Sequence, residues 1–269
     1  MAIPATAQRK QLRYPGRCGS CATSIPAGAT AFHDPATRTV YCVDCDATGV
    51  ESGVAGASAR RENERRKTSR EARIRRNHPV LGGFILAVSD DPQSTKSWAS
   101  GAIGEEKLGQ RLDALASTSV RVIHDRRMPR SRANIDHIVV ARSGVYVIDA
   151  KRYVGARPEL RREGGIIRPL VEKLIVGGRD RTSLAHGVHT QIDAVVDVLD
   201  VPGLDRVPVT GVLCFVDADW PLFGGSFVID ELHVLWPAKV GELIHRPGPL
   251  DLETTNRVFL TLARALRSA

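Results

Sequence analysis

Apolar positions along the middle of the chain alternate with a period of two, which predicts β-strands. Two runs rich in β-branched residues, Ile135–Val140 and Val145–Ile148, flank a Ser143-Gly144 turn signal and predict a β-hairpin. Other short apolar runs predict further strands at Val120–His124, Val207–Val216 and Phe227–Leu235, with more β structure after Tyr153.

Apolar residues at helical spacing alternate with these strands along the chain. They predict three amphipathic helices, at Trp98–Leu115, Thr182–Leu199 and Asp251–Arg267. Strands and helices mixed in this way predict an α/β domain over residues 79–269, with a central mixed sheet flanked by helices. The apolar patch Val80–Val88 is expected to pack onto that domain, and Cys214 to be a buried core residue.

The predicted hairpin carries charged side chains at its open end. Asp149 and Lys151 share one face of the second strand, because side chains alternate along a strand. If Ala141–Gly144 forms the loop, Asp136 lies directly opposite Asp149, with Cβ atoms roughly 5 Å apart. If Ser143 and Gly144 alone form it, Asp136 faces Lys151, and an odd loop would turn Asp136 to the other face. Two carboxylates and an ammonium group are costly to bury together, so either even register favours a divalent-cation site.

An acid on one strand, followed by Asp-x-Lys at the end of the next, resembles the PD-(D/E)xK nuclease superfamily. A longer series is similar to the nuclease-related domain family, NERD. It consists of G-A-I-G-E (Gly101–Glu105) with its helix, H-D-R-R-M-P-R-S-R-A-N-I-D-H (His124–His137) and G-V-Y-V-I-D-A-K-R-Y (Gly144–Tyr153). The proline of the superfamily's name is absent, since Ile135 precedes Asp136. The resemblance implies a restriction-endonuclease-like core.

The same resemblance implies a set of catalytic residues: Glu105, Asp136, Asp149, Lys151 and Gln191. Asp136 and Asp149 would hold Mg²⁺ or Mn²⁺, with Glu105 as a third acid on the sheet-facing side of its helix. The metal would lower the pKa of a bound water, and Lys151 would orient or deprotonate that water or stabilise the developing charge. Gln191 lies where related nucleases often place a glutamine near the scissile phosphate. The expected function is metal-dependent hydrolysis of phosphodiester bonds, with DNA as the favoured substrate.

Two C-x₂-C pairs precede this domain. Cys18, Cys21, Cys42 and Cys45 have a spacing typical of a tetrahedral thiolate zinc site, which predicts a zinc ribbon over residues 1–48. Two disulfides or four unconnected thiols are the rival arrangements, and a reducing cytosol disfavours the disulfides. Four cysteine ligands leave no open position for substrate, so the zinc is expected to be structural.

Positive charge is concentrated between these two regions. The chain has a net charge of +8 and a pI near 9.6, which favours a polyanionic partner. Residues 49–78 are expected to form a basic linker, and Ser58–Asn77 alone carries nine Lys or Arg against three Glu, a net +6. That stretch has no apolar stripe, so it is expected to be an exposed helix or disordered. A phosphate-contacting arm and a solvated spacer are both open. Aromatic residues make up only 5%, so stacking on many bases is not an obvious binding mode.

A second group of cations lies in the loop predicted over Asp125–Asn134, beside the hairpin's open end. Forked, permanently charged guanidinium groups suit phosphate contacts, although a solvated loop is an equal alternative. The candidates for nucleic-acid contact are Arg126, Arg127, Arg130 and Arg132.

Membrane association is not expected from the sequence. No apolar run approaches the ~20 residues that span a bilayer, and the start M-A-I-P-A-T-A-Q-R-K lacks the apolar segment of a signal peptide, so a cytoplasmic protein is expected. The leading alternative to a nuclease is a non-catalytic nucleic-acid-binding module on a nuclease-like scaffold. The acid–acid–lysine set argues against it, because a binder needs cations but no buried carboxylates. A third reading makes the hairpin charges a structural salt bridge in an interaction protein.

Overall fold

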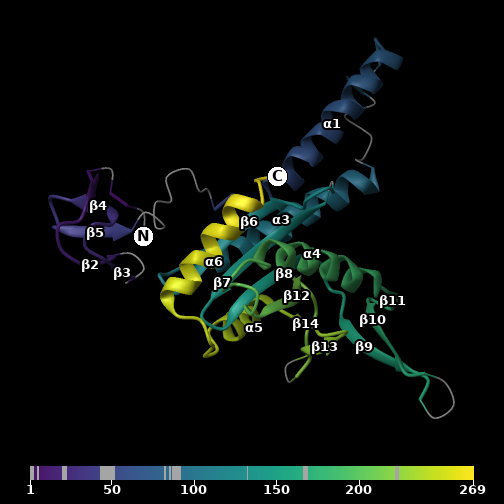
Figure 1. Ribbon diagram of the computed structural model, residues 1–269. Helices are drawn as coiled ribbons and strands as arrows, with labels where there is room; N and C mark the ends of the chain where they lie inside the picture. The colour runs from purple at the N-terminus through teal and green to yellow at the C-terminus, as the bar shows by residue number, and fades with distance from the viewer. Residues whose placement is uncertain are drawn as a thin grey trace.

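A six-stranded mixed sheet forms the centre of the protein (Figure 1). The computed structural model describes residues 3–4, 6–19, 23–42, 52–81, 83–84, 86, 92–131, 133–165, 169–221 and 224–269. The strands lie in the order β13-β14-β12-β8-β7-β6. β6, β7 and β8 form an antiparallel meander, whereas β8–β12 and β12–β14 are parallel pairs. The strands are β6 Val120–Arg127, β7 Asn134–Ala141, β8 Gly144–Arg152, β12 Val209–Val216, β13 Phe227–Ile229 and β14 Leu232–Leu235.

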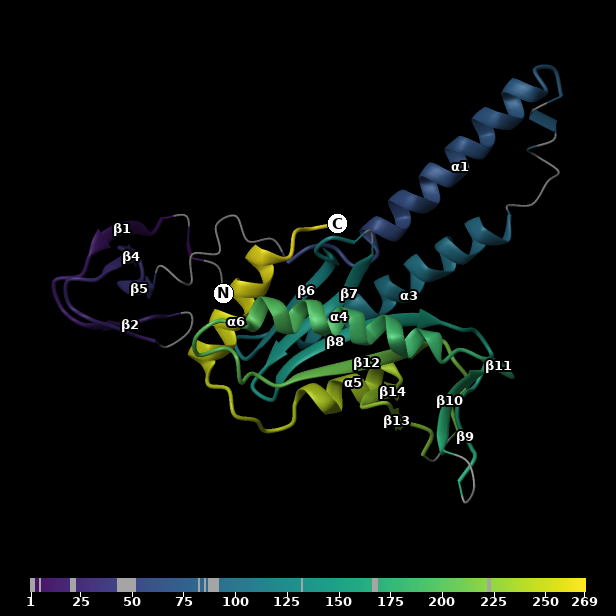
Figure 2. The ribbon, with the colours of Figure 1, turned by 45° about the vertical axis from the view of Figure 1, so that its right-hand side comes forward.

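Helices pack on both faces of this sheet (Figures 1 and 2). α3 (Gln93–Leu115) and α5 (Pro237–Ile244) cover one face, and α4 (Ser183–Leu199) and α6 (Leu252–Ala265) cover the other. The predicted α/β class with a central mixed sheet is therefore confirmed. α5, which was not predicted, is a short helix with its proline in the first turn, a position that needs no backbone N–H.

Two apolar clusters, one on each face, hold the layers together. On the α3 side, Leu108 and Leu112 are buried against β7 and β8; on the α4 side, Val195 of α4 and Val258 of α6 are buried against the same strands. Each fully buried side chain of this size contributes on the order of 2 kcal/mol. Cys214 is fully buried in β12, as predicted.

The hairpin between β7 and β8 turns through two residues. Ala141 pairs with Gly144, so Arg142 and Ser143 form the loop, one residue earlier than the Ser143-Gly144 signal. The register in which Ser143 and Gly144 alone form the loop is therefore wrong. Gly144 has φ 137°, and a Cβ there would lie 2.6 Å from the carbonyl oxygen of Pro208. The glycine is thus needed as the first residue of β8.

Three smaller β-sheets complete the described residues. β9, β10 and β11 form an antiparallel sheet beside the domain, which confirms the β structure expected after Tyr153. The predicted single strand Phe227–Leu235 is instead the β13–β14 hairpin, because Asp230 and Glu231 take left-handed conformations (φ 47° and 63°) that break it. The remaining strands form the other small sheets: β1 Gln8–Gln11, β2 Gly16–Arg17, β3 Ser24–Ile25, β4 Thr30–Asp34, β5 Thr39–Cys42, β9 Pro158–Glu163, β10 Val171–Val176 and β11 Arg179–Asp180.

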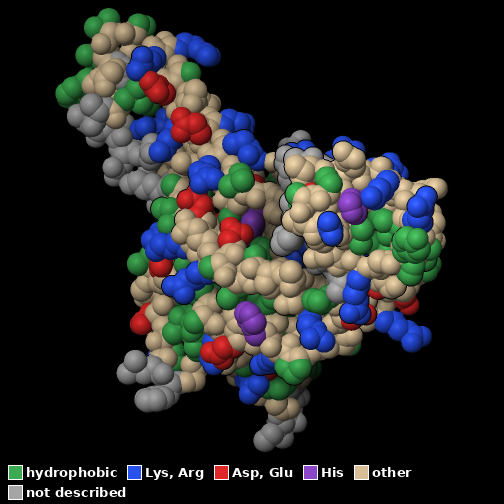
Figure 3. Space-filling model, turned by 90° about the vertical axis from the view of Figure 1, so that its left-hand side faces the viewer, with side chains coloured by type: hydrophobic (Ala, Val, Ile, Leu, Met, Phe, Trp, Pro, Cys, Tyr) green, Lys and Arg blue, Asp and Glu red, His purple; other side chains and the backbone are tan. Residues whose placement is uncertain are grey.

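α1 (Ala57–Asn77) projects from the domain alongside the first half of α3 (Figure 2). Arg60 and Glu106 form an ion pair at 2.7 Å, and the guanidinium of Arg66 lies 5.5 Å from the ring centroid of Trp98. Of the two predictions for this stretch, the exposed helix is thus confirmed. Figure 3 shows Lys and Arg side chains along this arm.

The apolar patch that follows α1 does not pack onto the domain over its described residues. Val80, Leu81 and Phe84 are 92%, 61% and 68% exposed. Hydrophobic side chains are accordingly visible at the tip of the arm in Figure 3. In the described ranges, no helix is both long enough and apolar enough to cross a bilayer.

Candidate active site

Asp136 and Asp149 lie opposite each other at the open end of the β7–β8 hairpin. The backbone ladder ends at the pair His137 and Ile148, so the next residues in the same register are the two aspartates. Asp136 Oδ2 accepts a hydrogen bond from the backbone N–H of Ala150 at 2.9 Å, where the ladder stops. Alternation along both strands puts the two carboxylates on the sheet face that α4 and α6 cover.

Lys151 is bound to Asp149 on that same face. Its Nζ lies 2.8 Å from Oδ1 and 2.7 Å from Oδ2 of Asp149. Burial by itself lowers the pKa of Lys151, but the charges of Asp149 and Asp136 outweigh it, so the pKa is raised above its usual value. The ammonium group is therefore charged at any physiological pH.

Glu105 reaches this edge of the sheet from α3, one turn before the buried Leu108. Its pKa is raised to about 7, because burial disfavours the charged form and the carboxylates of Asp125 and Asp149 add to that effect against the charge of Lys151. The pKa of Asp136 is raised well above its usual range by burial and then by Glu105 and Asp149. Since neighbouring carboxylates contribute to both pKa shifts, Glu105, Asp136 and Asp149 form one acidic cluster.

The three acidic side chains lie near one another but do not form a complete set of metal ligands. Among the described residues, no three His, Cys, Asp or Glu side chains converge on one point as a metal-ligand set. The reason is visible in the contacts: Asp149 is turned to Lys151, and Asp136 is turned to the N–H of Ala150.

Gln191 lies on the buried side of α4, in line with Val188 and Val195. Val195 packs against the sheet face that carries the aspartates, so Gln191 lies toward the same face. The residue is 8% exposed, and its Oε1 is buried without a hydrogen-bond partner in the described part of the chain. Among the described side chains, Gln191 forms no hydrogen bond with Asp149 or Lys151. It therefore lies toward the same face as these predicted catalytic residues without being hydrogen-bonded to them.

A cleft of about 650 Å³ opens onto this cluster. The first half of α3 forms one wall and the end of β8 forms another, so both Glu105 and Lys151 face into it. Its lining residues are Ser97, Trp98, Ser100, Gly101, Glu105, Ala150, Lys151, Arg152, Tyr153 and Arg181.

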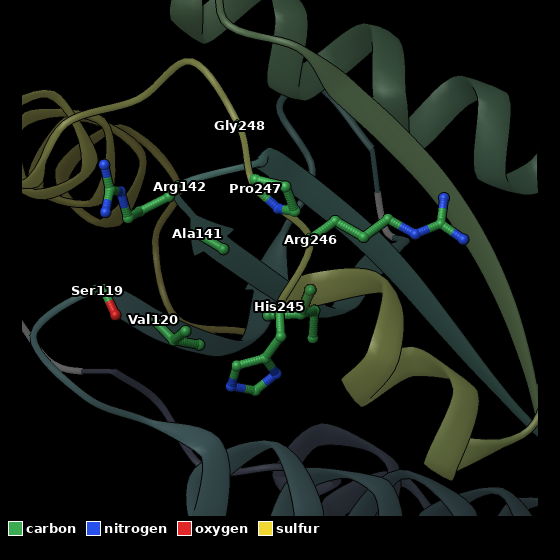
Figure 4. Close-up of a pocket in the computed structure, with 9 residues that line it drawn as sticks. Ser119, Val120, Ala141, Arg142, His245, Arg246, Pro247 and Gly248 are labelled. Atoms are coloured by element: carbon green, nitrogen blue, oxygen red, sulfur yellow. The ribbon is translucent and has the colours of Figure 1, made fainter.

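A smaller cavity of about 300 Å³ lies at the opposite end of the sheet, near the β7–β8 loop (Figure 4). No carboxylate is among its described lining residues, which include Ser119, His245 and Gly248. The side chains of Arg142 and Arg246 extend in opposite directions in Figure 4, so they do not converge on a ligand. This cavity therefore lacks the chemistry of a divalent-metal site.

The four arginines expected to contact nucleic acid differ in their positions. Arg126 is only 3% exposed, and its Nη1 donates to the carbonyl of Leu266 at 3.2 Å and to Ser268 Oγ at 3.1 Å. The assignment of Arg126 to nucleic acid is thus wrong, because β6 continues through it and the C-terminal segment covers it. Arg127 and Arg130 are exposed at the same edge of the sheet as the acids. Arg132 is outside the described residues.

A polar network of two buried histidines and the exposed Asp113 of α3 was not anticipated from the sequence. Asp113 Oδ1 lies 2.9 Å from His124 Nε2, and His124 Nδ1 lies 2.8 Å from His137 Nδ1. A carboxylate only accepts, so a neutral His124 accepts in turn from His137 at Nδ1. Burial, together with His124, holds the pKa of His137 well below its usual value. The network ties β6 and β7 to α3 beside Asp136; only the H-D and D-H pairs in the sequence hinted at it.

The N-terminal cysteines are only partly covered by the described residues. Cys18 and Cys42 are buried and form no disulfide with each other, and the N–H of Cys42 donates to Cys18 Sγ at 3.3 Å. One cysteine from each C-x₂-C pair is thus brought close to the other. Cys21 and Cys45 are outside the described residues.

One comparison with known proteins agrees with this geometry. Residues 100–216 match the family model of NERD, the nuclease-related domain. The match runs from within α3 to the last residue of β12, so it includes Glu105, both aspartates, Lys151 and Gln191 but neither α1 nor the four N-terminal cysteines. The NERD match implies a nuclease-like function. Comparison with curated proteins and with solved structures finds no match.

Proposed function

We propose that this protein is a divalent-metal-dependent nuclease that hydrolyses phosphodiester bonds in DNA, built on a restriction-endonuclease-like core. One observation carries the proposal. Asp136 and Asp149 share a sheet face at one edge, with the Nζ of Lys151 at 2.7 Å from Asp149, beside a cleft that Glu105 also lines.

The acidic cluster fits Mg²⁺ or Mn²⁺. Carboxylate oxygens are the ligands these hard cations prefer. Burial, and then crowding of like charges, raises the pKa values of Glu105 and Asp136, and a bound dication would relieve the repulsion between those charges. Asp136 and Asp149 would hold the metal, with Glu105 assisting. When bound, it would supply a water of lowered pKa and offset charge on the phosphate.

Lys151 acts in this proposal as a cation rather than as a base. Because neighbouring carboxylates raise its pKa, it keeps its proton and cannot readily accept another from water. It therefore orients the attacking water and stabilises negative charge on the phosphoryl oxygens. Gln191 contributes its unpartnered Oε1, which can accept a hydrogen bond from a water in the site.

The proposed DNA substrate is supported by exposed positive charge, and the proposed zinc site by the chemistry of the cysteines. Arg127, Arg130 and the α1 arm are exposed cations suited to a phosphate backbone. Cys18 and Cys42, with their two C-x₂-C partners, would hold one structural Zn²⁺; N–H donation to sulfur, as from Cys42, stabilises a thiolate ligand.

Cleavage of circular and linear DNA in the presence of Mg²⁺ or Mn²⁺ tests the proposal. Asp149→Asn keeps the shape but removes a negative ligand, so cleavage should fall roughly 100-fold or more while DNA affinity without metal is retained. Asp197→Asn, an exposed position on α4, is the matched control and should cleave normally.

Two outcomes would contradict the proposal. Equal cleavage by wild type and Asp149→Asn would move the active site elsewhere. Tight DNA binding with no cleavage of any DNA or RNA form would favour the second candidate, a non-catalytic nucleic-acid-binding module, for which the basic α1 arm is the supporting observation.

A further inference from the structure

The cleft beside the acidic cluster has an aromatic and cationic half that the proposed chemistry does not use. Trp98 enters it from α3 and is 40% exposed. Tyr153 enters it just beyond β8, with its ring tilted against the buried Phe215 at a centroid distance of 5.6 Å. The lining of the cleft therefore includes two aromatic side chains.

Arg181 supplies a guanidinium group to the same half. Its backbone N–H donates to the carbonyl of Leu174 at 2.7 Å, which fixes the residue just before α4. The guanidinium lies 5.9 Å from the ring centroid of Tyr153, and its Nε is buried without a hydrogen-bond partner among the described residues. An unpartnered buried N–H of this kind is costly unless a ligand accepts from it.

The other cations that line the cleft are already paired. Lys151 is bound to Asp149, and Arg152 Nε donates to Asp217 Oδ2 at 2.7 Å. Among the described residues, no carboxylate pairs with Arg181. Its charge is thus available to an anion in the cleft, and a planar fork of N–H groups matches phosphate oxygens.

We propose that Trp98, Tyr153 and Arg181 form a nucleotide subsite that takes one unpaired nucleotide of the substrate strand next to the scissile phosphate. Arg181 binds the phosphate, and the base stacks on the aromatic side chains. Bases inside a duplex have both faces covered by their neighbours, so the subsite selects a strand that is single-stranded or frayed at this point. This inference extends the proposed nuclease function and rests on it, because it takes the bound strand to be the substrate.

Binding measured without cleavage tests the subsite. The probes are a short fluorescein-labelled oligothymidylate and a mixed-sequence duplex of equal length, followed by fluorescence anisotropy in Ca²⁺. Arg181→Ala and Tyr153→Leu should each weaken oligothymidylate binding about tenfold, the size of one lost stacking or phosphate contact. Duplex binding should change by less than about twofold.

Four further variants separate the subsite from a general loss of charge or of the fold. Arg179→Ala removes an exposed charge two residues away and outside the cleft, so both affinities should stay unchanged. Tyr153→Phe keeps the stacking surface and should bind like wild type. Trp98→Phe should do the same, whereas Trp98→Leu should weaken oligothymidylate binding, provided circular dichroism shows the wild-type fold.

The result separates this inference from the proposed function. Equal loss for oligothymidylate and duplex, or no loss at all, overturns the subsite while leaving metal-dependent cleavage intact. Selective loss in a protein that cleaves no substrate would support the subsite as a nucleotide-binding site and overturn the nuclease.

Discussion

The carboxylate of Asp125, in β6, caps the first turn of α1 through Ser58. Its Oδ2 accepts from the backbone N–H of Ser58 and its Oδ1 from the hydroxyl of Ser58, both at 2.6 Å. The N-cap position of α1 is Gly56, which has no side chain to accept a hydrogen bond, so the capping acid comes from a strand. Asp125 also raises the pKa of Glu105. One buried carboxylate therefore contacts the base of α1 and acts electrostatically on the acidic cluster.

Removing this acid should loosen the arm. Asp125→Ala leaves the backbone N–H and the hydroxyl of Ser58, in the first turn of α1, without the carboxylate that accepts from them, which should cost about 1–2 kcal/mol. Trypsin, which cuts after the many arginines of α1, should then cleave the arm severalfold faster at a given protease concentration. Thr68→Ala, at an exposed position of the same helix, is the control. An unchanged cleavage rate in Asp125→Ala would show that Ser58 gains nothing from the contact.

Stability of the metal-free protein should depend on pH through Glu105. Its pKa is about 7 when folded and 4.5 as an ordinary side chain, so the folded state binds more protons between these values. The contribution of Glu105 to stability is therefore present at low pH and is lost as pH rises through about 7.

Glu105→Gln, which cannot titrate, isolates that contribution. In thermal unfolding without metal, the Tm of wild type should fall relative to Glu105→Gln by on the order of 5 °C between pH 5 and pH 8. Excess Mg²⁺ should restore more of the wild-type Tm at the higher pH than at the lower. Parallel Tm curves for the two proteins would contradict the assignment of the pKa shift to Glu105.

Lys151 should be required for DNA cleavage but not for metal binding. Lys151→Ala removes the cation that now neutralises Asp149, so Mn²⁺ affinity should hold or rise while cleavage falls roughly 100-fold or more. Calorimetric Mn²⁺ titration alongside the DNA assay measures both. A variant that loses metal binding together with cleavage would mean that the lysine instead holds the ligands in place.

Contacts between α1 and phosphates should appear in the salt dependence of DNA binding. Changing Arg73 and Arg76 to Gln should reduce the slope of log affinity against log salt by roughly 0.9 per lost contact on duplex DNA. The same changes at Arg206 and Arg264, exposed cations on the main domain, should leave the slope alone. If the slope is unchanged by the substitutions in α1, the arm is a spacer rather than a contact surface.

Elemental analysis should find about one Zn²⁺ per chain, in line with a four-thiolate structural site. Cys42→Ser should lose the metal, whereas Cys214→Ala, which changes a core cysteine far along the sequence, should keep it. A folded, reduced wild-type protein that contains no zinc would rule out the ribbon.

Periodicity predicted the part of the site that depends on local geometry. Because strand side chains alternate, any even loop had to put Asp136 and Asp149 on one face, and the helical spacing of Glu105 with Leu108 set its direction. The exact loop depended on Pro208, whose carbonyl oxygen excludes a side chain at position 144, and no local turn rule contains that contact.

The parts that were missed depend on contacts between distant segments. Arg126 looks exposed beside its charged neighbours, but the last residues of the chain run along β6 and accept its hydrogen bonds. Arg181 became a candidate only when its place before α4 brought it to Tyr153. Charge and spacing identify such residues as polar, whereas tertiary packing decides whether they face solvent, a partner or a cleft.

The strand that carries Asp149 and Lys151 is bonded on both sides, by β7 and by β12. Its parallel partner is separated from it in sequence by α4 and the β9–β11 sheet, so the amide protons of β8 up to Ile148, where the pairing with β7 ends, should exchange with solvent only when the whole domain opens. Those of α1, which has a single buried residue, need far smaller fluctuations. Hydrogen–deuterium exchange should thus register the site as the slowest part of the molecule and the basic arm as among the fastest. The arm can rearrange around a nucleic acid while the backbone under the carboxylates keeps its form.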